Sequence, residues 1–370
     1  MALMKAIGLM SGTSLDGVDV ALVETDGESA IRFGPTHYRR YSDGEQRLLR
    51  DALAEAASLE ERHARPSVLK QAEALVTKVH ADLAGAFVRR YEIKPGDVAV
   101  VGFHGQTVLH KPEARLTVQI GDGIALAHAL GIAVAYDFRA ADVAAGGQGA
   151  PIVPIFHRAI AQTLARPGPV AVLNIGGVAN VTYVEAGENP VACDTGPGNA
   201  LIDDFMREHT GKPLDRDGAE AAKGKPDEEF IAHVLEHPFF AAPYPKSLDR
   251  NTFAFARTGL PTFSVEDGAA TLTALTAAAV ARVVPHLPKP PRTWVLTGGG
   301  AHNPTLLRML SERLKPARVE TAGAVGWSAD ALEAQAFAYL AVRTLKQLPI
   351  TFPTTTGAPR PMTGGMLARP

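Results

Sequence analysis

The chain has 370 residues, of which 46% are hydrophobic and 21% are charged, and its formal net charge is -2. This length accommodates two domains with sizeable cores, and the composition excludes disordered and fibrous proteins. A charge so close to neutral gives no electrostatic footprint for nucleic acid or an anionic membrane, so we expect small molecules as partners.

The sequence indicates a cytoplasmic protein. Its single cysteine, Cys193, cannot form an internal disulfide, and nothing points to an oxidising compartment. The N-terminal MALMKAIGLM runs directly into the first expected strand, without the apolar segment and cleavage site of a signal peptide. No run of about 20 uninterrupted apolar residues occurs, so we expect no membrane partner.

Residues 7–24, IGLMSGTSLDGVDVALVE, predict a strand, a polar glycine turn and a second strand. Glycines let a ligand approach the backbone, hydroxyls donate to phosphate oxygens, and carboxylates hold a metal through water. The pattern fits a phosphate-binding hairpin, with a plain structural turn as the alternative. A Walker A loop and a dinucleotide fingerprint are excluded because a strand follows and lysine is absent. The turn residues concerned are Gly12, Thr13, Ser14, Asp16, Gly17 and Asp19.

A third strand is expected over 31–41, and helices over 45–59 and 67–90. Residues 98–103 are continuously apolar, as in a parallel strand covered on both faces. In open α/β sheets ligands bind at the carboxyl ends of strands. The polar residues that follow this strand, His104 to Thr107, are therefore a candidate site, although a histidine there is also compatible with a capped loop.

Two further strands are predicted over 117–120 and 132–136, each followed by a polar turn, and the second turn contains Arg139. Residues 144–154, AAGGQGAPIVP, cannot form regular structure because glycine and proline dominate them. We expect the boundary between two domains within residues 121–154.

The second half opens as the first does, with strands over 170–175 and 178–184 joined by Gly176 and Gly177. The repeat indicates an internal duplication. Asp194 is expected to end a short strand, and Asn199 to cap a helix over 200–210. A carboxylate at this place fits either a helix-terminal role or an exposed general base.

Residues 233–237, HVLEH, match the H-x-x-E-H pattern of a zinc peptidase class and provide a hypothesis from another class of enzyme. However, His237 precedes Pro238 at an expected helix end, and no third ligand follows in a recognisable context. We therefore expect a solvated helix terminus.

An alanine-rich helix is expected over 266–284 and a strand over 294–296. Three glycines, Gly298 to Gly300, then lead into a helix capped by Asn303, with Pro304 at its first position. Such a turn brings backbone close to a flat ligand such as a nucleoside. A final amphipathic helix over 330–345 carries Glu333, and the tail from Pro349 must pack or fray.

The order of these motifs resembles the phosphate and adenosine motifs of the actin, hexokinase and heat-shock chaperone ATPase superfamily. Within it, the chain resembles the anhydro-N-acetylmuramic acid kinases. The resemblance extends from residue 4 to about residue 365 and rests on the strings GLMSGTSLDGVDVAL, FHGQT, QIGD, DFR, GGQGAP, NIGGVANVTYV, DTGPGN, TGGGAHN and EAQAFAYLA.

The resemblance implies a two-domain α/β fold of the actin/hexokinase-like, ribonuclease H-like type, with an interdomain active-site cleft. The expected N-terminal domain comprises residues 1–125 and 346–370, and the C-terminal domain residues 126–345. The family also implies a homodimer.

The implied reaction opens the 1,6-anhydro ring of anhydro-N-acetylmuramic acid with water and places the ATP γ-phosphate on O6, a step in recycling cell-wall sugar. Water must attack the anomeric carbon opposite O6, which requires a carboxylate base. We expect Asp194 in that role, and Glu333 is similar to a family glutamate near the sugar. The alternatives are a kinase acting on a free sugar hydroxyl and an actin-like or chaperone-like ATPase.

The resemblance also implies the ligand-binding residues. Arg139 is a plausible partner for the lactyl carboxylate of the sugar. Mg²⁺ is implied by phosphoryl transfer from ATP, with Asp16 or Asp19 as a candidate ligand. The expected ATP-binding residues are Gly12, Thr13, Ser14, Leu15, Asp16, Gly17, Val18, Asp19, Gly176, Gly177, Asn180, Gly298, Gly299, Gly300 and Asn303, and the expected sugar-binding residues are His104, Gly105, Gln106, Thr107 and Arg139.

Overall fold

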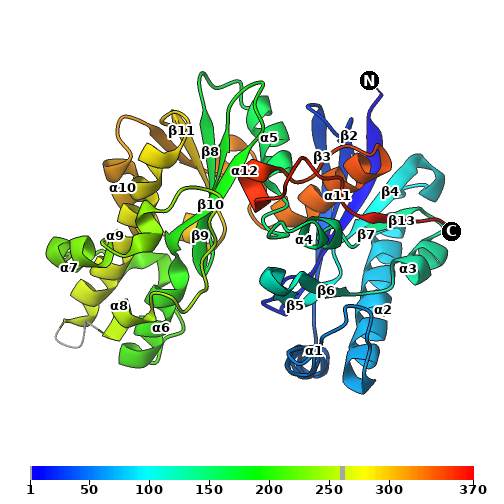
Figure 1. The fold of residues 1–370 in the computed structure, drawn as a ribbon, viewed down its shortest axis with the longest axis horizontal. Helices are drawn as coiled ribbons and strands as arrows, with labels where there is room; N and C mark the ends of the chain where they lie inside the picture. Colours follow the sequence, from blue (N-terminus) through cyan, green and yellow to red (C-terminus); the bar gives the residue numbers. More distant parts are fainter. Residues whose placement is uncertain (1, 259–262) are drawn as a thin grey trace. The chain divides into compact units, whose positions relative to one another are not determined.

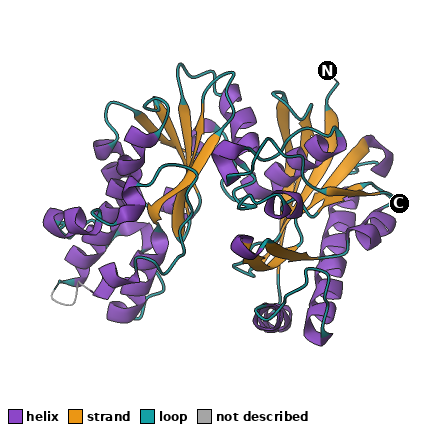
Figure 2. Cartoon of the chain, in the orientation of Figure 1, coloured by secondary structure: helices purple, strands orange, loops and turns teal. Residues whose placement is uncertain are grey.

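A computed structural model describes residues 2–258 and 263–370. The chain divides into two compact α/β units. Unit 1 comprises Met1–Ile160 and Asp330–Pro370, and unit 2 comprises Ala161–Ala329. Each unit has its own hydrophobic core and its own sheet flanked by helices (Figure 2).

The sheet of unit 1 has the strand order β13-β7-β4-β1-β2-β3 (Figure 1). Strands β1, β2 and β3 form an antiparallel meander, and β1, β4 and β7 are parallel. A separate two-stranded sheet joins β5 to β6. The bounds are β1 Met4–Met10, β2 Gly17–Thr25, β3 Ile31–Arg40, β4 Val98–Phe103, β5 Gln106–Lys111, β6 Leu116–Ile120, β7 Val134–Tyr136 and β13 Met366–Ala368.

The sheet of unit 2 has the order β10-β9-β8-β11-β12. Here too three strands, β8 to β10, form an antiparallel meander. On its other side β8 pairs in parallel with β11, which pairs in parallel with β12. This common pattern agrees with the expected internal duplication. The bounds are β8 Val170–Ile175, β9 Val178–Val184, β10 Val191–Pro197, β11 Thr293–Thr297 and β12 Arg318–Thr321.

Capping side chains near the helix N-termini determine where several helices begin. In α1 a capping box joins Ser42 and Glu45, and in α10 the Asn303 side chain accepts from Leu306 N–H as expected. The bounds are α1 Asp43–Ala56, α2 Ser67–Arg90, α3 Gly123–Leu130, α4 Ala140–Ala144, α5 Pro154–Thr163, α6 Asn199–Thr210, α7 Glu228–Val234, α8 Ala254–Thr258, α9 Val265–Val283, α10 Pro304–Arg313, α11 Leu332–Leu345 and α12 Pro353–Thr356.

Helix α11 lies unusually close to the sheet of unit 1. A Cβ atom at Gly8 of β1 would lie 1.8 Å from the Ala334 carbonyl oxygen, and one at Gly102 of β4 would lie 2.0 Å from that of Phe337. Glycine is therefore required at these two positions, where the helix backbone crosses β1 and β4. This close packing fixes the first turn of α11, which carries Glu333, relative to the sheet.

Within the described residues, one helical stretch, Val265–His286, is long and apolar enough to cross a membrane, and 78% of its apolar window is buried inside the protein. The alanines of α9 are mostly buried in the core of unit 2. Small side chains suit this position because neighbouring helices pack closely around α9.

The domain boundaries differ from those expected. The chain passes from unit 1 to unit 2 after Ile160 and returns to unit 1 at Asp330, whereas the expected boundaries were 125/126 and 345/346. Strand β7 pairs with β4, and α11 packs on β1, β2 and β4, so residues 126–160 and 330–345 belong to unit 1. Glu333 therefore lies in unit 1, whereas Asp194 lies in unit 2.

Other local expectations were wrong. Gln106 and Thr107 begin strand β5 instead of lying in a loop, because they pair with β6. Strand β10 continues past Asp194 to Pro197, and Gly198 is the N-cap of α6. Asn199 does not cap α6, since its side chain donates to the Ile175 carbonyl oxygen. The tail packs through α12 and through pairing of β13 with β7.

Candidate functional site

The turn between β1 and β2 is tied to the end of β4. Ser11 Oγ donates to the Gly105 carbonyl oxygen at 3.0 Å, and Gln106 Nε2 donates to that of Gly12 at 3.1 Å. Residues that the sequence places at two separate positions, the hairpin turn and the end of β4, therefore form one hydrogen-bonded cluster. Such a cluster keeps the turn in a fixed position beside the strand end.

The turn residues divide into ligand-accessible and structural ones. Thr13 and Ser14 are exposed, and Ser14 Oγ donates to the Asp16 carboxylate at 2.5 Å. In contrast, Leu15 and Val18 are buried in the core, so only their backbone can meet a ligand. Gly17 is needed for packing, because a Cβ there would lie 2.4 Å from the Arg39 carbonyl oxygen.

Carboxylates gather beside this turn. Burial raises the pKa of Asp19 to about 7, and Asp16, Glu333 and Asp330 raise it further by repulsion. Desolvation also raises the pKa of Glu333, while Arg139 opposes the increase. No group of three or more His, Cys, Asp or Glu side chains that could hold a metal occurs among the described residues. The repulsion at Asp19 and Asp16 nevertheless fits Mg²⁺, which often uses one or two carboxylates with water and phosphate.

His104 is a buried neutral imidazole. Its Nδ1 lies 3.1 Å from the Ser11 carbonyl oxygen and 2.9 Å from that of Gly105, so Nδ1 carries the hydrogen. Nε2 then accepts a 3.2 Å hydrogen bond from Arg139 Nη2. Burial and the Arg139 charge lower the pKa of His104 to about 3. Both ring nitrogens are thus used inside the protein, which makes His104 a residue that orients Arg139.

Arg139 keeps bonding capacity for a ligand. Its Nη1 donates to the Gly149 carbonyl oxygen at 2.8 Å, its Nε has no partner, and it forms no ion pair with any residue of the described ranges. Burial lowers its pKa to about 10, which leaves it charged at neutral pH. The negative charges of Glu333 and Asp142 act on Arg139 without forming an ion pair with it. A buried guanidinium without a directly bonded carboxylate is costly, and an anionic ligand would supply that partner.

The neighbouring amides also retain unused acceptors. Gln106 Oε1 and Gln119 Oε1 are buried without partners, and Gln119 Nε2 donates to Thr107 Oγ1 at 3.3 Å. Gly105 has φ +69° and a Cβ there would lie 2.5 Å from the Ile120 carbonyl oxygen, so it shapes the chain between β4 and β5. These polar atoms and Arg139 form a candidate site for a hydroxylated, anionic molecule.

In unit 2 the turn between β8 and β9 lies against two glycine-containing segments. The N–H groups of Gly198 and Asn199 donate to the carbonyl oxygens of Gly177 and Gly176, at 3.0 and 2.7 Å. A Cβ at Gly300 would lie 2.5 Å from Ile175 Cγ2, and one at Gly298 would lie 2.4 Å from Asn174 Oδ1. The second hairpin turn and the triple-glycine turn therefore adjoin, as a nucleotide site requires.

Two further residues of unit 2 can be placed. Asn180 pairs with Asn174 on β8 and with Asp194 on β10, so these three residues lie side by side across the sheet. The Asn303 side-chain oxygen is occupied by capping α10, which leaves its amide nitrogen for any ligand.

Asp194 has one oriented and one unoccupied carboxylate oxygen. Leu248 N–H donates to Oδ2 at 2.7 Å, and Asp194 N–H donates to the Lys246 carbonyl oxygen at 2.9 Å. Oδ1 receives no hydrogen bond from the described part of the chain. Burial raises the pKa of Asp194 to about 6, against the opposing effects of Leu248 N–H and Lys246. The carboxylate does not bond the N-terminus of α6, which removes the helix-terminal interpretation and favours a base.

Lys246 and Leu248 could not be identified from sequence patterns. They lie more than 50 residues from Asp194, within a segment that shows no periodic pattern. Main-chain donors carry no signature in the residue type, so only the structure identifies this contact.

The zinc-peptidase hypothesis finds no support. His233 pairs with Glu236 at 3.3 Å with both side chains largely exposed, and His237 Nδ1 accepts from Phe239 N–H. These contacts are those of a solvated helix end.

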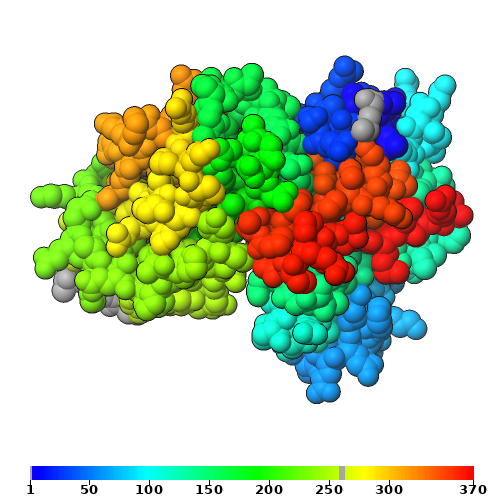
Figure 3. Space-filling view, turned by 45° about the horizontal axis from the view of Figure 1, so that its top comes forward, coloured from blue at the N-terminus to red at the C-terminus, as the bar shows by residue number. Residues whose placement is uncertain are grey.

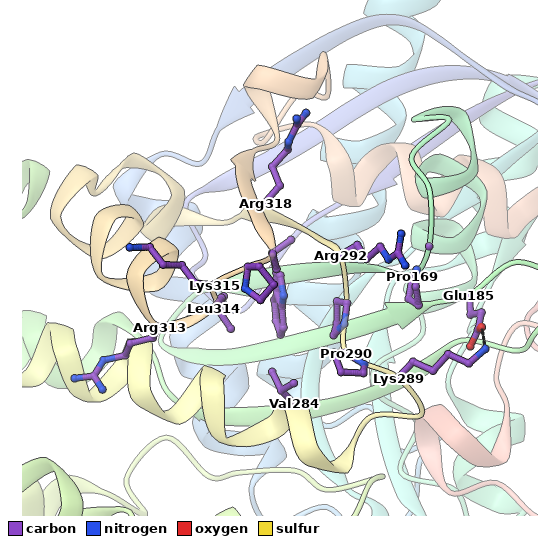
Figure 4. Close-up of a pocket in the computed structure, with 15 residues that line it drawn as sticks. Pro169, Glu185, Val284, Lys289, Pro290, Arg292, Arg313, Leu314, Lys315 and Arg318 are labelled. Carbon is purple, nitrogen blue, oxygen red and sulfur yellow. Dashed lines mark hydrogen bonds and ion pairs between the residues drawn. The ribbon is translucent and has the colours of Figure 1, made fainter.

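A cavity of about 1030 Å³ lies elsewhere on unit 2, at the amino-terminal ends of β8 and β11 (Figure 4). Proline rings and Trp294 line it. The charged groups of Arg313, Lys315 and Arg318 do not converge on one point, and Lys289 pairs with Glu185. Because ligands in such sheets bind at the carboxyl ends of strands, this cavity is not the candidate site.

Comparison with known proteins gives a consistent result. A family model described as anhydro-N-acetylmuramic acid kinase matches residues 4–369. Proteins named anhydro-N-acetylmuramic acid kinase from Nitrobacter winogradskyi and Methylorubrum populi are 61% and 53% identical, each over 100% of both chains. The same name belongs to a Bradyrhizobium diazoefficiens protein, 59% identical over 100% of both chains.

Among solved structures, component A of (R)-2-hydroxyglutaryl-CoA dehydratase from Acidaminococcus fermentans is similar, with a TM-score of 0.50. It is 13% identical and covers 93% of this chain and 99% of its own. This likeness concerns the fold alone, and it agrees with the expected two-domain α/β class.

Proposed function

Since the chain belongs to the anhydro-N-acetylmuramic acid kinase family and is therefore a phosphotransferase, we propose that it also opens the 1,6-anhydro ring of this sugar with water. The product is N-acetylmuramic acid 6-phosphate, formed in the cytoplasm during recycling of cell-wall sugar. The observation that carries the proposal is the Asp194 carboxylate, which is oriented through Oδ2, unoccupied at Oδ1 and raised in pKa to about 6.

The chemistry needs one base and one phosphoryl donor. Water attacks the anomeric carbon and loses a proton to Asp194, while the bond from that carbon to O6 breaks. O6 takes the γ-phosphoryl group of ATP and ADP leaves, so no separate general acid is needed. A base with a pKa near 6 is ionised at neutral pH and still a competent proton acceptor.

The ligand roles are assigned from exposure and free bonding capacity. We assign the sugar to the Arg139 and Gln106 cluster, with the Arg139 guanidinium binding the lactyl carboxylate and Glu333 supporting. Phosphate binding is assigned to the turn at Gly12 to Asp19 and to Gly176, Gly177 and Asn180. The nucleoside is assigned to the triple-glycine turn, Gly298 to Gly300, and to Asn303.

Phosphoryl transfer from ATP implies Mg²⁺, and Asp16 and Asp19 would hold it. When bound, the ion neutralises charge on the phosphates. Asp16 accepts from the exposed Ser14 hydroxyl, and its repulsion with Asp19 gives a divalent cation a favourable place.

The test uses protein, ATP, magnesium and anhydro-N-acetylmuramic acid in ¹⁸O-water, followed by mass spectrometry. We expect label on the anomeric oxygen and none in the phosphate, because water attacks carbon. Phosphorylated sugar that retains the anhydro ring would favour the alternative, a kinase for a free hydroxyl. ATP turnover that is independent of sugar would favour an actin-like or chaperone-like ATPase. The homodimer that the family implies stays a prediction, which analytical ultracentrifugation would check.

A further inference from the structure

The C-terminal segment, residues 349–365, is folded back on unit 1. Ile350 N–H donates to the Met362 carbonyl oxygen at 2.8 Å, and Met362 N–H donates to that of Thr351 at 2.9 Å. Thr344 of α11 donates to the Gly364 carbonyl oxygen at 2.8 Å. Outer residues of this segment form part of the molecular surface (red in Figure 3), whereas Thr351 and Thr356 are fully buried.

These two threonines meet a buried carboxylate, Asp142 of α4, which is 2% exposed. Asp142 Oδ2 accepts from Thr351 Oγ1 at 2.5 Å and from Thr356 Oγ1 at 2.7 Å. The other oxygen, Oδ1, accepts from Gly149 N–H at 2.6 Å. A buried carboxylate needs such donors, because a carboxylate removed from water without hydrogen bonds is strongly destabilising. The hydroxyls of the C-terminal segment therefore determine where Asp142 sits.

Asp142 in turn holds the glycine loop, residues 145–149. A Cβ at Gly147 would lie 2.2 Å from Asp142 Oδ1, so the loop backbone packs directly on the carboxylate. Gln148 N–H also donates to the Thr356 carbonyl oxygen at 2.7 Å. The loop is thus clamped between α4 and the C-terminal segment.

Gly149 connects this clamp to the sugar site. Its N–H is held by Asp142, and its carbonyl oxygen accepts from Arg139 Nη1 at 2.8 Å. Gly149 has φ +67°, and a Cβ there would lie 2.4 Å from Val143 Cγ2, so another residue could not replace it without strain. Displacement of the loop would move the acceptor that orients the Arg139 guanidinium.

We propose that Asp142, Thr351 and Thr356 are positioning residues, through which the C-terminal segment sets the orientation of Arg139 for the substrate carboxylate. The inference rests on the proposed function in one respect, the binding of a carboxylated sugar by Arg139. The C-terminal segment is then part of the sugar site although it contributes no group that touches the sugar.

The test compares the double variant Thr351→Val, Thr356→Val with wild type. Valine keeps the shape of threonine and removes the hydroxyl, so we expect the KM for anhydro-N-acetylmuramic acid to rise about 10-fold or more. The KM for ATP should stay unchanged. Thr363→Val is the matched control, because Thr363 is an exposed residue of the same segment.

A second pair of variants tests the carboxylate. Asp142→Ala should raise the sugar KM in the same way. Asp142→Asn should restore most of the sugar affinity, because its Oδ1 still accepts from Gly149 and its amide donates to hydroxyls that can rotate to accept. Equal rises in both KM values, or an unchanged sugar KM in the double variant, would overturn the proposal.

Hydrogen exchange separates this inference from the proposed function. Peptides covering residues 144–153 should exchange faster in Asp142→Ala and in the double valine variant, and at the wild-type rate in Thr363→Val. If wild type does not phosphorylate the anhydro sugar, the proposed function fails, and the exchange result alone decides whether the segment holds the loop. Unchanged exchange in both variants would overturn the inference even if wild type is active.

Discussion

The main-chain N–H of Leu248 donates a 2.7 Å hydrogen bond to Oδ2 of Asp194 and leaves Oδ1 without a partner in the described part of the chain. A main-chain donor fixes the carboxylate without neutralising it. This hydrogen bond restrains rotation of the carboxylate, so the lone pairs of Oδ1 have a preferred direction. This is the preorganisation that a general base requires.

Asp194→Asn should strongly reduce ring opening and ADP formation together while both ligands still bind. Asparagine can still accept the Leu248 hydrogen bond but cannot accept a proton from water. We expect kcat to fall by about 10² to 10⁴-fold, as for loss of a general base. Steady-state kinetics and calorimetry would measure this, with Asp82→Asn, an exposed residue of α2, as control. Product formation at nearly the wild-type rate would remove Asp194 from the mechanism.

The dependence of kcat/KM on pH should show the ionisation of the Asp194 carboxyl group. Because burial raises its pKa to about 6, kcat/KM should fall as pH decreases through about 6, where the base becomes protonated. Lys246 lowers this pKa by its charge, so Lys246→Met should move the acid limb to higher pH. Lys289→Met, at a lysine paired with Glu185, should leave the limb in place. A limb that does not move in the Lys246 variant would contradict the assignment.

Gly12→Val should weaken ATP binding far more than folding. A Cβ at Gly12 would meet only Ser14 Oγ at 3.7 Å and Met10 Cε at 3.9 Å, which are ordinary contacts. The added methyl groups would instead occupy the space where phosphates approach the backbone. Gly96→Val is the control, since a Cβ there has nothing within 4 Å. Equal losses of thermal stability and ATP affinity in the Gly12 variant would mean that the turn is only structural.

Arg139→Ala should raise the KM for the sugar and spare that for ATP. Loss of a buried partner to a carboxylate costs about 2 to 5 kcal/mol. Arg139→Lys should not restore binding, because lysine cannot donate to Gly149, His104 and a carboxylate in one plane. Arg32→Ala, at an exposed residue of β3, is the control. An unchanged sugar KM would exclude Arg139 from the site.

Unit 1 should be the acid-sensitive part of the chain. Burial lowers the pKa values of His80, His104 and His157 to about 4, 3 and 4, whereas an unfolded histidine titrates near 6.5. Because the folded pKa values are lower than the unfolded one, the unfolded state binds protons first as pH falls. The stability that the neutral histidines contribute is therefore complete above about pH 6.5 and is lost as pH falls toward the folded pKa values. Each contributes up to about 1.4 kcal/mol per pH unit in that window. The raised pKa values of Asp19 and Glu333 act in the opposite direction, but these are two groups against three histidines.

Both tryptophans, Trp294 and Trp327, lie in unit 2, so their fluorescence follows unit 2 while circular dichroism follows both units. Between pH 7 and pH 5, the urea midpoint should fall more by dichroism than by tryptophan fluorescence. His80→Phe, which keeps a ring against Phe103, should reduce the difference. Equal shifts in both signals would contradict this expectation.

The sequence by itself determined the family and much of the local structure. The two glycine hairpins, the cap at Asn303 and the helix over Ser67–Arg90 follow from periodicity and turn chemistry, which act between near neighbours in the chain. The family motifs likewise lie in short continuous strings, so they could be read without a structure.

Only the tertiary structure decided how the site residues are held. Thr351 meets Asp142 across 209 residues, Leu248 meets Asp194 across 54, and Arg139 meets His104 across 35. The same packing places Glu333 in unit 1 and turns Gln106 and Thr107 into strand. No local pattern specifies these contacts, because burial and strand pairing bring distant residues together only as the units fold.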